Sequence, residues 1–415
     1  MKRNLYIVAL IVLTFFVISF LTNIIGPLVP DIIESFDLSL TMVALLPFAF
    51  FIAYGIMSIP SGMLVEKFGE KKLMVAAFLM SSLGAGLLAL FPGFNMYLVS
   101  LFMIGTGMAI LQVAINPLLR VAGGEEHFAF NSVMAQLFFG LASFLSPLVY
   151  SYIVVSMADQ GQADFFISIL SGLVPENLPW ISLYWIFAII SLLMVFIIGF
   201  TRFPSVELKE DEKVGALETH IELLKQPMVI LYFLGVFAYV GTEQGVANWI
   251  SEFLQTYHGV DPQTQGASTV SYFWGMMTAG TALGLILLKF VDSRRVMIWF
   301  TLAAIISLTV SLFGSKEMAL MGFPMVGFFA SVMWSIIISL ALNSVSSHHG
   351  SFSGILVTGI AGGAIFPLIV GWLGDLVGLQ MGMLFLYIPL GYILSIGFWS
   401  KPLITNKTLS GKIQE

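Results

Sequence analysis

One carboxylic acid and two amides lie within a stretch that is otherwise apolar enough to cross a membrane. The stretch from Pro227 to Tyr257 reads PMVILYFLGVFAYVGTEQGVANWISEFLQTY, and Glu243, Gln244 and Asn248 lie near its middle. An acidic side chain at mid-membrane costs about 2.5 to 3.5 kcal/mol on insertion scales, so it normally faces a cavity and marks a pathway or a relay. We therefore predict that this helix lines a central aqueous cavity.

Three kinds of chemistry are open to Glu243: it could carry a proton, bind Na⁺ through oxygen ligands, or hydrogen-bond a substrate. Residues four apart share one face of a helix, so Gln244 and Asn248 lie together and could add oxygens to a cation site. Tyr239 adds a hydroxyl group to the same wall. The structural alternative is a neutral carboxyl group buried between helices. We interpret Glu243 as the cation-coupling residue, because intramembrane acids are functional by default.

Amide and aromatic side chains on the apolar runs are candidates for substrate binding. Gln112 and Asn116 share a helix face, and Gln136 lies on the next run. A sugar needs several such partners and an aromatic plane against its C–H face. The available planes are Tyr239, Trp249, Trp274 and Trp334. The alternatives are hydrogen bonds between helices for the amides, worth about 0.6 to 2 kcal/mol each, and packing at the membrane interface for the tryptophans, which suits Trp180 and Trp185.

The composition places these residues in an integral membrane protein. Of 415 residues, 58% are hydrophobic and 10% are charged, and the mean hydropathy is +0.98. A soluble domain keeps about 25% of its residues charged, so this chain cannot form a water-facing surface. Cysteine is absent, which excludes disulfides and thiolate metal sites. The chain has no basic stripe of the kind that binds nucleic acid.

Twelve apolar runs are long enough to span a bilayer, whose hydrocarbon core takes about 20 helical residues. Their expected ranges are 6–30, 39–63, 73–92, 96–120, 129–155, 181–203, 227–256, 268–289, 296–314, 318–343, 352–374 and 380–399. The first run lacks a small-residue cleavage site, so we interpret it as a spanning helix and not a signal peptide. With the N-terminus inside, every basic residue except Lys316 is cytoplasmic. The positive-inside rule therefore places both termini in the cytoplasm.

The longest polar connection divides the chain between the sixth and seventh runs. It predicts an N-terminal bundle at 1–203, a cytoplasmic linker at 204–226, and a C-terminal bundle with a short cytoplasmic tail at 227–415. The linker sequence ALETHIELLKQ could form a short amphipathic helix on the cytoplasmic surface. The other long connection, Met157–Trp180, is external and partly apolar, so we expect it at the membrane interface as a lid.

The two halves share a pattern at the ends of their second runs. GMLVEKFGEKKLM and GLILLKFVDSRRVMI each have a glycine in the helix end, then a short charged loop with a basic pair. Repeated halves are typical of secondary transporters, whose binding site lies near mid-membrane between them. The first loop resembles the signature of the major facilitator superfamily, which implies a conformational switch; a plain positive-inside loop is the alternative. The residues concerned are Gly62, Glu66, Lys67, Gly69, Lys71 and Lys72.

A second resemblance covers essentially the whole chain. The segments 111–117 (LQVAINP), 239–243 (YVGTE), 327–345 and 362–394 resemble the fucose–galactose–glucose cation symporter branch of that superfamily. The resemblance implies an all-α membrane protein with twelve transmembrane helices in two pseudo-symmetric six-helix bundles, and it adds Asn23 to the substrate-binding candidates. The branch pattern has an aspartate in run one and a glutamate in run four, where this chain has Gly26 and Gln112. Glu243 is then the one acid expected deep in a span.

We therefore expect a secondary active transporter: a symporter of a hexose or deoxyhexose, coupled to Na⁺ or H⁺, that works by alternating access. A multidrug or metabolite exporter of the same fold and a non-transporting membrane receptor are the alternatives. No Walker loop or catalytic pattern indicates an enzyme, and His348–His349 lacks partners for a metal site. The expected partners are a sugar and the lipid bilayer, with no cofactor beyond the coupling ion, for a monomer in a bacterial inner membrane.

Overall fold

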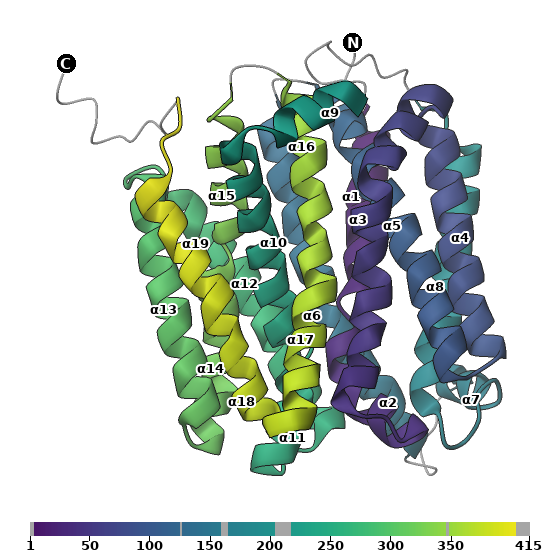
Figure 1. Cartoon of the computed structure of the whole chain (residues 1–415). Helices are drawn as coiled ribbons and strands as arrows, with labels where there is room; N and C mark the ends of the chain where they lie inside the picture. The colour runs from purple at the N-terminus through teal and green to yellow at the C-terminus, as the bar shows by residue number, and fades with distance from the viewer. Residues whose placement is uncertain (1–3, 125–126, 159–164, 204–216, 346–347, 404–415) are drawn as a thin grey trace.

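The computed structural model describes residues 4–124, 127–158, 165–203, 217–345 and 348–403. Every regular element within them is helical, and twelve helical segments are long and apolar enough to cross a membrane. The predicted all-α membrane fold is confirmed. One end of the bundle carries α9 (Leu217–Leu224) and the other carries α11 (Ile250–His258), as Figure 1 shows. We call these the α9 end and the α11 end.

Six spans form the N-terminal half of the bundle. They are α1 (Leu5–Thr22) with α2 (Ile25–Phe36), α3 (Leu40–Phe68), α4 (Glu70–Leu90), α5 (Phe94–Gly123), α6 (Phe128–Ala158), and η2 (Pro179–Ile181) with α8 (Ser182–Phe200). A short helix, α7 (Phe165–Ser171), precedes the sixth span at the α11 end. Within this half α4 packs on α5 and α8, and α1 packs on α6.

Six further spans form the C-terminal half. They are α10 (Pro227–Ala247), η4 (Pro262–Gly266) with α12 (Ala267–Leu287), α13 (Ser293–Phe313), α14 (Lys316–Ala330) with α15 (Met333–Leu342), α16 (His349–Thr358) with η5 (Gly359–Ala361) and α17 (Gly362–Val377), and α18 (Leu379–Met383) with η6 (Leu384–Leu386) and α19 (Tyr387–Trp399). The halves meet along two main helix pairs, α3 with α17 and α6 with α12.

The first span of each half is broken at an asparagine. Helix α1 ends at Asn23 because Pro27, four residues later, has no N–H group and its ring clashes with the Asn23 carbonyl. Helix α10 ends at Asn248, whose side-chain amide donates to the Gln244 carbonyl at 2.8 Å and competes with the backbone ladder. The sequence ranges 6–30 and 227–256 gave each run as one span and did not locate these breaks. Breaks at matching places in two halves are typical of transporter binding sites.

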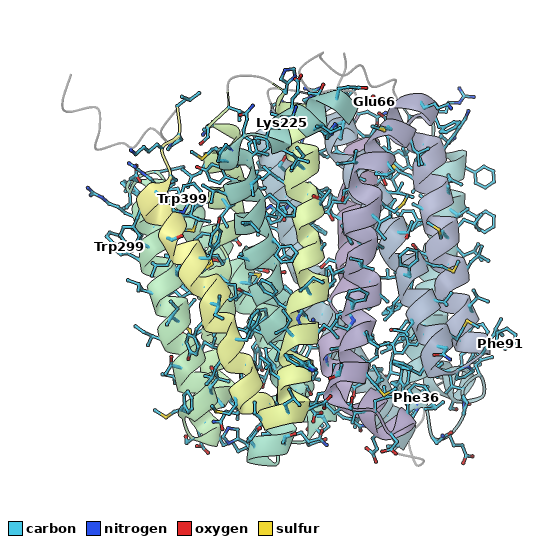
Figure 2. The ribbon with its side chains drawn as sticks, in the orientation of Figure 1. Phe36, Glu66, Phe91, Lys225, Trp299 and Trp399 are labelled. Carbon is cyan, nitrogen blue, oxygen red and sulfur yellow. The ribbon has the colours of Figure 1, made fainter. Side chains whose placement is uncertain are left out.

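The two long connections are partly described. Helix α9 confirms the short helix expected in the linker, whose residues 204–216 lie outside the described part. Between Met157 and Trp180, residues 159–164 are likewise outside it, and α7 exposes Phe165 and Phe166. The interface position expected for Trp180 was wrong: it is 1% exposed, packs on Tyr97, and donates to Ser35 Oγ at 3.0 Å. Trp299 and Trp399 instead lie toward the α9 end (Figure 2).

The loop that resembles the superfamily signature is reduced to one residue. Helix α3 ends at Phe68 and α4 begins at Glu70, with Gly69 alone between them at φ +83°. A Cβ atom on Gly69 would meet nothing within 4 Å, so the left-handed backbone and not space requires glycine. The predicted turn is present, and Figure 2 shows Glu66 at the α9 end. Its role as a conformational switch stays a prediction.

Candidate binding cavity

A cavity of about 580 Å³ lies between the two halves. The N-terminal half contributes residues of α1, α3, α5 and α6, and the C-terminal half contributes residues of α10, α12 and α15. This volume falls in the range of about 300 to 1,000 Å³ that small-molecule sites occupy. The cavity therefore has the place and size expected of a substrate site between pseudo-symmetric halves.

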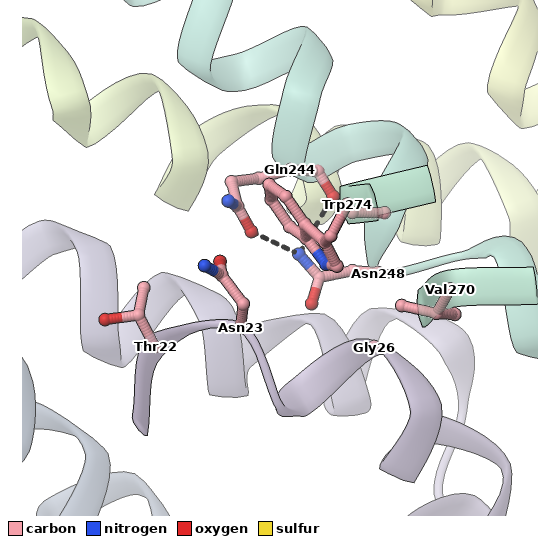
Figure 3. Close-up of a pocket in the computed structure, with 8 residues that line it drawn as sticks. Thr22, Asn23, Gly26, Gln244, Asn248, Val270 and Trp274 are labelled. Carbon is pink, nitrogen blue, oxygen red and sulfur yellow. Dashed lines mark hydrogen bonds between the residues drawn. The ribbon is translucent and has the colours of Figure 1, made fainter. Parts of the chain in front are cut away.

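The cavity extends from the middle of the bundle to the α9 end. Its α6 lining runs from Ser143 back to Ser132, close to the helix start, and its α12 lining runs from Trp274 to Ile286, close to the helix end. Toward the α11 end it stops near Asn23. A small separate pocket follows there, where the broken first spans of the two halves cross (Figure 3). The structure is thus open toward the α9 end and closed toward the α11 end.

Glu243 lines this cavity and is half-buried. Its Oε1 accepts a hydrogen bond from Gln244 Nε2 at 3.2 Å, and the Tyr239 hydroxyl lies beside its carboxyl group. Among the described lining residues Glu243 is the one acid, and none is Lys, Arg, His or Asp. The arrangement can hold one proton or one cation in an otherwise uncharged chamber.

A chain of amides leads from the closed pocket to this carboxyl group. Asn248 Nδ2 donates to Gln244 Oε1 at 3.2 Å and to the Gln244 carbonyl oxygen at 2.8 Å. The Gln244 amide nitrogen then donates to Glu243. Asn23 points across the small pocket toward both amides (Figure 3), and its own Nδ2 donates to Ser143 Oγ at 2.9 Å. The chain links the crossing of the broken helices to the acid in the cavity.

The structure brings most of the predicted binding residues together. Those that line the cavity are Asn23, Gln112, Gln136, Tyr239, Gln244, Trp274 and Trp334. Asn248 and Trp249 do not line it: Asn248 borders the small pocket, and Trp249 is buried with its Nε1 donating to the Pro367 carbonyl at 3.3 Å. Asn248 stays on the helix face of Gln244, to which it donates, whereas Trp249 lies in the break between α10 and α11. Asn116 lies on α5, and its side chain is outside the described part.

Sequence reasoning missed several polar groups. Thr22, Tyr54 and Thr278 add hydroxyl groups to the cavity wall, and hydroxyls are too frequent in apolar runs to single out. Asp31 is a second acid within a span: it is 8% exposed on α2 and accepts from Tyr150 Oη at 2.7 Å and from Gln263 Nε2 at 3.2 Å. Asp31 lies toward the α11 end of this span, so Glu243 stays the one acid predicted near mid-membrane. The sequence range for run one stopped at residue 30, whereas α2 continues through DIIESF.

The twelve spans and the cavity between two halves define a membrane transporter. The chain matches the model of the Major Facilitator Superfamily over residues 11–250. It is 30% identical over 390 residues to a glucose/galactose transporter of Brucella abortus, covering 93% of this chain and 92% of that protein. It is 25% identical over 388 residues to the L-fucose-proton symporter of Escherichia coli, with 89% and 87% covered.

The likeness extends to solved structures. A bacterial homologue of the human lysosomal transporter Spinster, in an inward-facing and occupied conformation, superposes with a TM-score of 0.77 at 17% identity over 95% of this chain and 96% of that one. This likeness shows the fold. The chain belongs to the Major Facilitator Superfamily, in its fucose/glucose/galactose symporter family, and is a transporter and not an enzyme.

Proposed function

We propose that this protein is a proton-coupled symporter of a neutral hexose or deoxyhexose. The observation that carries the proposal is the single acid, Glu243, on the wall of a cavity that both halves line. The names of the relatives support the sugar, because they are a glucose/galactose transporter and an L-fucose-proton symporter. The protein would lie in a bacterial plasma membrane as a monomer.

The membrane orientation follows from the basic residues. Lys67 lies in the last turn of α3, Lys71 and Lys72 lie in the first turn of α4, and Arg294 and Arg295 lie in the first turn of α13, all at the α9 end. Because cytoplasmic loops carry the excess of Lys and Arg, the α9 end faces the cytoplasm. The conformation described here is then inward-facing, and the sugar would leave through the end that is open.

The lining favours an uncharged polar substrate. Gln112, Gln136 and Asn23 offer amide donors and acceptors, and Trp274 and Trp334 offer aromatic planes. Phosphorylated or carboxylated sugars call for Arg or Lys partners, and the described lining has neither. A neutral sugar fits these groups, and one cation can bind beside it.

The hydrogen bonds around Glu243 favour a proton over Na⁺. A sodium site needs several oxygens that converge, yet Gln244 turns its NH₂ group toward Glu243 while its oxygen accepts from Asn248. A carboxyl group that meets amide and hydroxyl donors is better suited to gain and lose a proton. Sugar and proton would favour one open face together, since ligands shift a conformational equilibrium only through differential affinity. The bodies that rock are 1–203 and 227–415, joined by the linker 204–226.

The test is uptake of labelled hexoses into proteoliposomes with separate Na⁺ and pH gradients. We expect accumulation to follow the pH gradient. Glu243→Gln should abolish accumulation while sugar exchange across the membrane continues, because the empty and loaded carriers no longer differ in charge. Glu252→Gln is the matched control: this acid follows α10 outside the spans and the cavity, and partial burial raises the pKa of its carboxyl group. Normal accumulation by Glu243→Gln would contradict the assignment.

An exporter remains the second candidate because the part of the cavity toward the α9 end is apolar. Val133, Leu137, Met277, Leu285 and Ile286 line it, and such a wall suits bulky apolar cargo. Drug-stimulated proton flux without any sugar flux would decide for the exporter. Specific sugar binding by the purified protein without counterflow would instead favour the receptor alternative.

A further inference from the structure

A sequence pattern occurs twice, at opposite ends of two helices that pack on each other. The pattern is glycine, three residues, an acid, two residues, and glycine. Its members are Gly62, Glu66 and Gly69 on α3 at the α9 end, and Gly371, Asp375 and Gly378 on α17 at the α11 end. Gly69 has φ +83° and ψ 155°, and Gly378 has φ +89° and ψ 147°. In both places the next helix begins at once, so the two turns share one backbone form.

The acid of the second copy binds the start of a helix in the other half. Asp375 Oδ1 accepts from the Leu40 N–H at 2.9 Å, and Oδ2 accepts from the Thr41 N–H at 2.9 Å and the Thr41 hydroxyl at 2.5 Å. The Ser39 hydroxyl accepts from the next donor, the Met42 N–H, at 3.2 Å, and the Val43 N–H makes the first bond within the helix, to the Ser39 carbonyl at 3.0 Å. The first three N–H groups of α3, which a helix start leaves without a partner inside the helix, are thus all bonded, two of them from across the interface.

The same helix pair is close at the α11 end and loose at the α9 end. A Cβ atom on Gly371 would lie 2.6 Å from the Leu40 carbonyl oxygen, which real side chains do not allow. Halfway along, a Cβ on Gly55 would meet Ala361 Cβ at 3.0 Å. Near the α9 end, a Cβ on Gly354 would meet nothing closer than 3.9 Å, where Ile59 and His220 lie. Glycine thus lets α17 reach α3 where Asp375 binds.

We propose that Asp375 is the residue that latches the α11 end shut. Its carboxylate caps α3 and holds the two halves together there while the cavity is open at the α9 end, because an anion at a helix N-terminus is stabilised by free N–H groups and the helix dipole. The inference needs alternating access, but neither the sugar nor the proton.

Thiol labelling tests the latch directly, because the natural chain has no cysteine. Val270→Cys reports on the α11 end, since Val270 is fully buried beside the closed pocket, and Ser132→Cys reports on the cavity near the α9 end. Each is combined with Asp375→Ala and labelled without substrate or gradient. We expect about fivefold to tenfold faster labelling at position 270 and slower labelling at 132, the size that loss of an N-terminal cap predicts.

Two further variants keep the test decisive. Glu317→Ala removes an acid that bonds within its own half at the α11 end, to Ser315 Oγ at 2.8 Å, and it should leave both rates unchanged. Gly371→Ala keeps Asp375 but forces α17 away from Leu40, and it should act like Asp375→Ala. Equal rates for Asp375→Ala and the parent at both reporters would overturn the proposal. Sugar transport is not measured, so failure here is separate from failure of the proposed function.

Discussion

The two ends of the interface between the halves are built differently. At the α11 end the halves bond to each other: Asp375 caps α3, Gln263 donates to Asp31, and Ser271 Oγ donates to the Phe144 carbonyl at 2.6 Å. Toward the α9 end, α6 and α12 line the cavity instead, α6 from Gly140 back to Ser132 and α12 from Thr278 to Ile286. The difference shows that the α11 end is the closed end of the protein. A helix N-terminus, side-chain hydrogen bonds and close contacts at glycines hold it closed.

The contacts that close the α11 end also differ from those inside one half. Within the N-terminal half, Trp180, Tyr97 and Tyr184 form a fully buried aromatic cluster with a 2.5 Å hydrogen bond between the two tyrosine hydroxyls. Burying large aromatic side chains is worth several kcal/mol in total. The interface instead uses single hydrogen bonds of about 0.5 to 3 kcal/mol each. Each half can therefore move as a body while the seal between them breaks and re-forms.

Among the variants, Gly26→Val is expected to have the largest effect on the closed α11 end. A Cβ atom on Gly26 would lie 2.5 Å from the Ala247 carbonyl oxygen, where the broken first spans cross. Overpacking costs about 1 to 3 kcal/mol or more, so the closed α11 end should lose about tenfold to a hundredfold in population. Uptake should fall in proportion while Val270→Cys labels faster. Gly86→Val on α4, where a Cβ meets nothing within 4 Å, is the control. If Gly26→Val took up sugar at the wild-type rate, the crossing of the two broken spans would not be needed to close the α11 end.

Ala282→Trp tests the opposite end. Ala282 is exposed on the cavity wall toward the α9 end, so the present conformation has room for an indole there. Closing the α9 end would bury that indole against α6 at a similar cost of about 1 to 3 kcal/mol. We expect uptake to fall about tenfold, with slower labelling at Val270→Cys, the reverse of Gly26→Val. Faster labelling at that reporter would mean that the α9 end does not close along this wall.

Much of this contrast could not be predicted from the sequence. The twelve spans follow from apolar length, and the cavity position of Glu243 follows from the cost of an isolated acid in a membrane. Helical periodicity places Asn248 on the face of Gln244, as observed, but it does not predict that α10 ends at this residue, where the backbone N–H and the side-chain amide of Asn248 both donate to the Gln244 carbonyl. The sequence range for the first run stopped at Pro30, yet α2 continues past Asp31 to Phe36. The local sequence pattern predicts where the helices lie. The positions at which helices break, and the contacts that close one end of the protein, depend on residues far apart in the sequence.

Gln263→Ala should have a smaller effect, and it should affect only the closing of the α11 end. Gln263 lies on η4 in the C-terminal half and donates to Asp31 in the other half at 3.2 and 3.4 Å. Loss of such a bond should shift the equilibrium away from the closed α11 end by about threefold to fivefold. Tyr150→Phe also removes a donor to Asp31, but within one half. It should lower the melting temperature without changing the labelling ratio of the two cysteine reporters. Identical labelling shifts for both variants would mean that Asp31 acts through its own half.

Asn248→Ala is expected to have an effect of similar size and concerns the link between the closed pocket and the cavity. Asn248 donates both to the Gln244 backbone carbonyl, which ends α10, and to Gln244 Oε1, which orients the amide that faces Glu243. Losing one hydrogen bond of about 1 kcal/mol should lower sugar accumulation about fivefold, with less than a twofold change in the KM for sugar exchange, because Asn248 does not line the cavity.

Asn248→Ser separates the two bonds. A serine hydroxyl can still bond the carbonyl four residues earlier but is too short to reach the Gln244 side chain. If Asn248 acts by positioning Gln244, the serine variant should keep the parent's melting temperature and show the low accumulation of the alanine variant. If its role is only to end α10, accumulation should return to the parent level. A large rise in the exchange KM for both variants would instead place Asn248 against the sugar, and would mean that the α10 break opens the small pocket to substrate during the cycle.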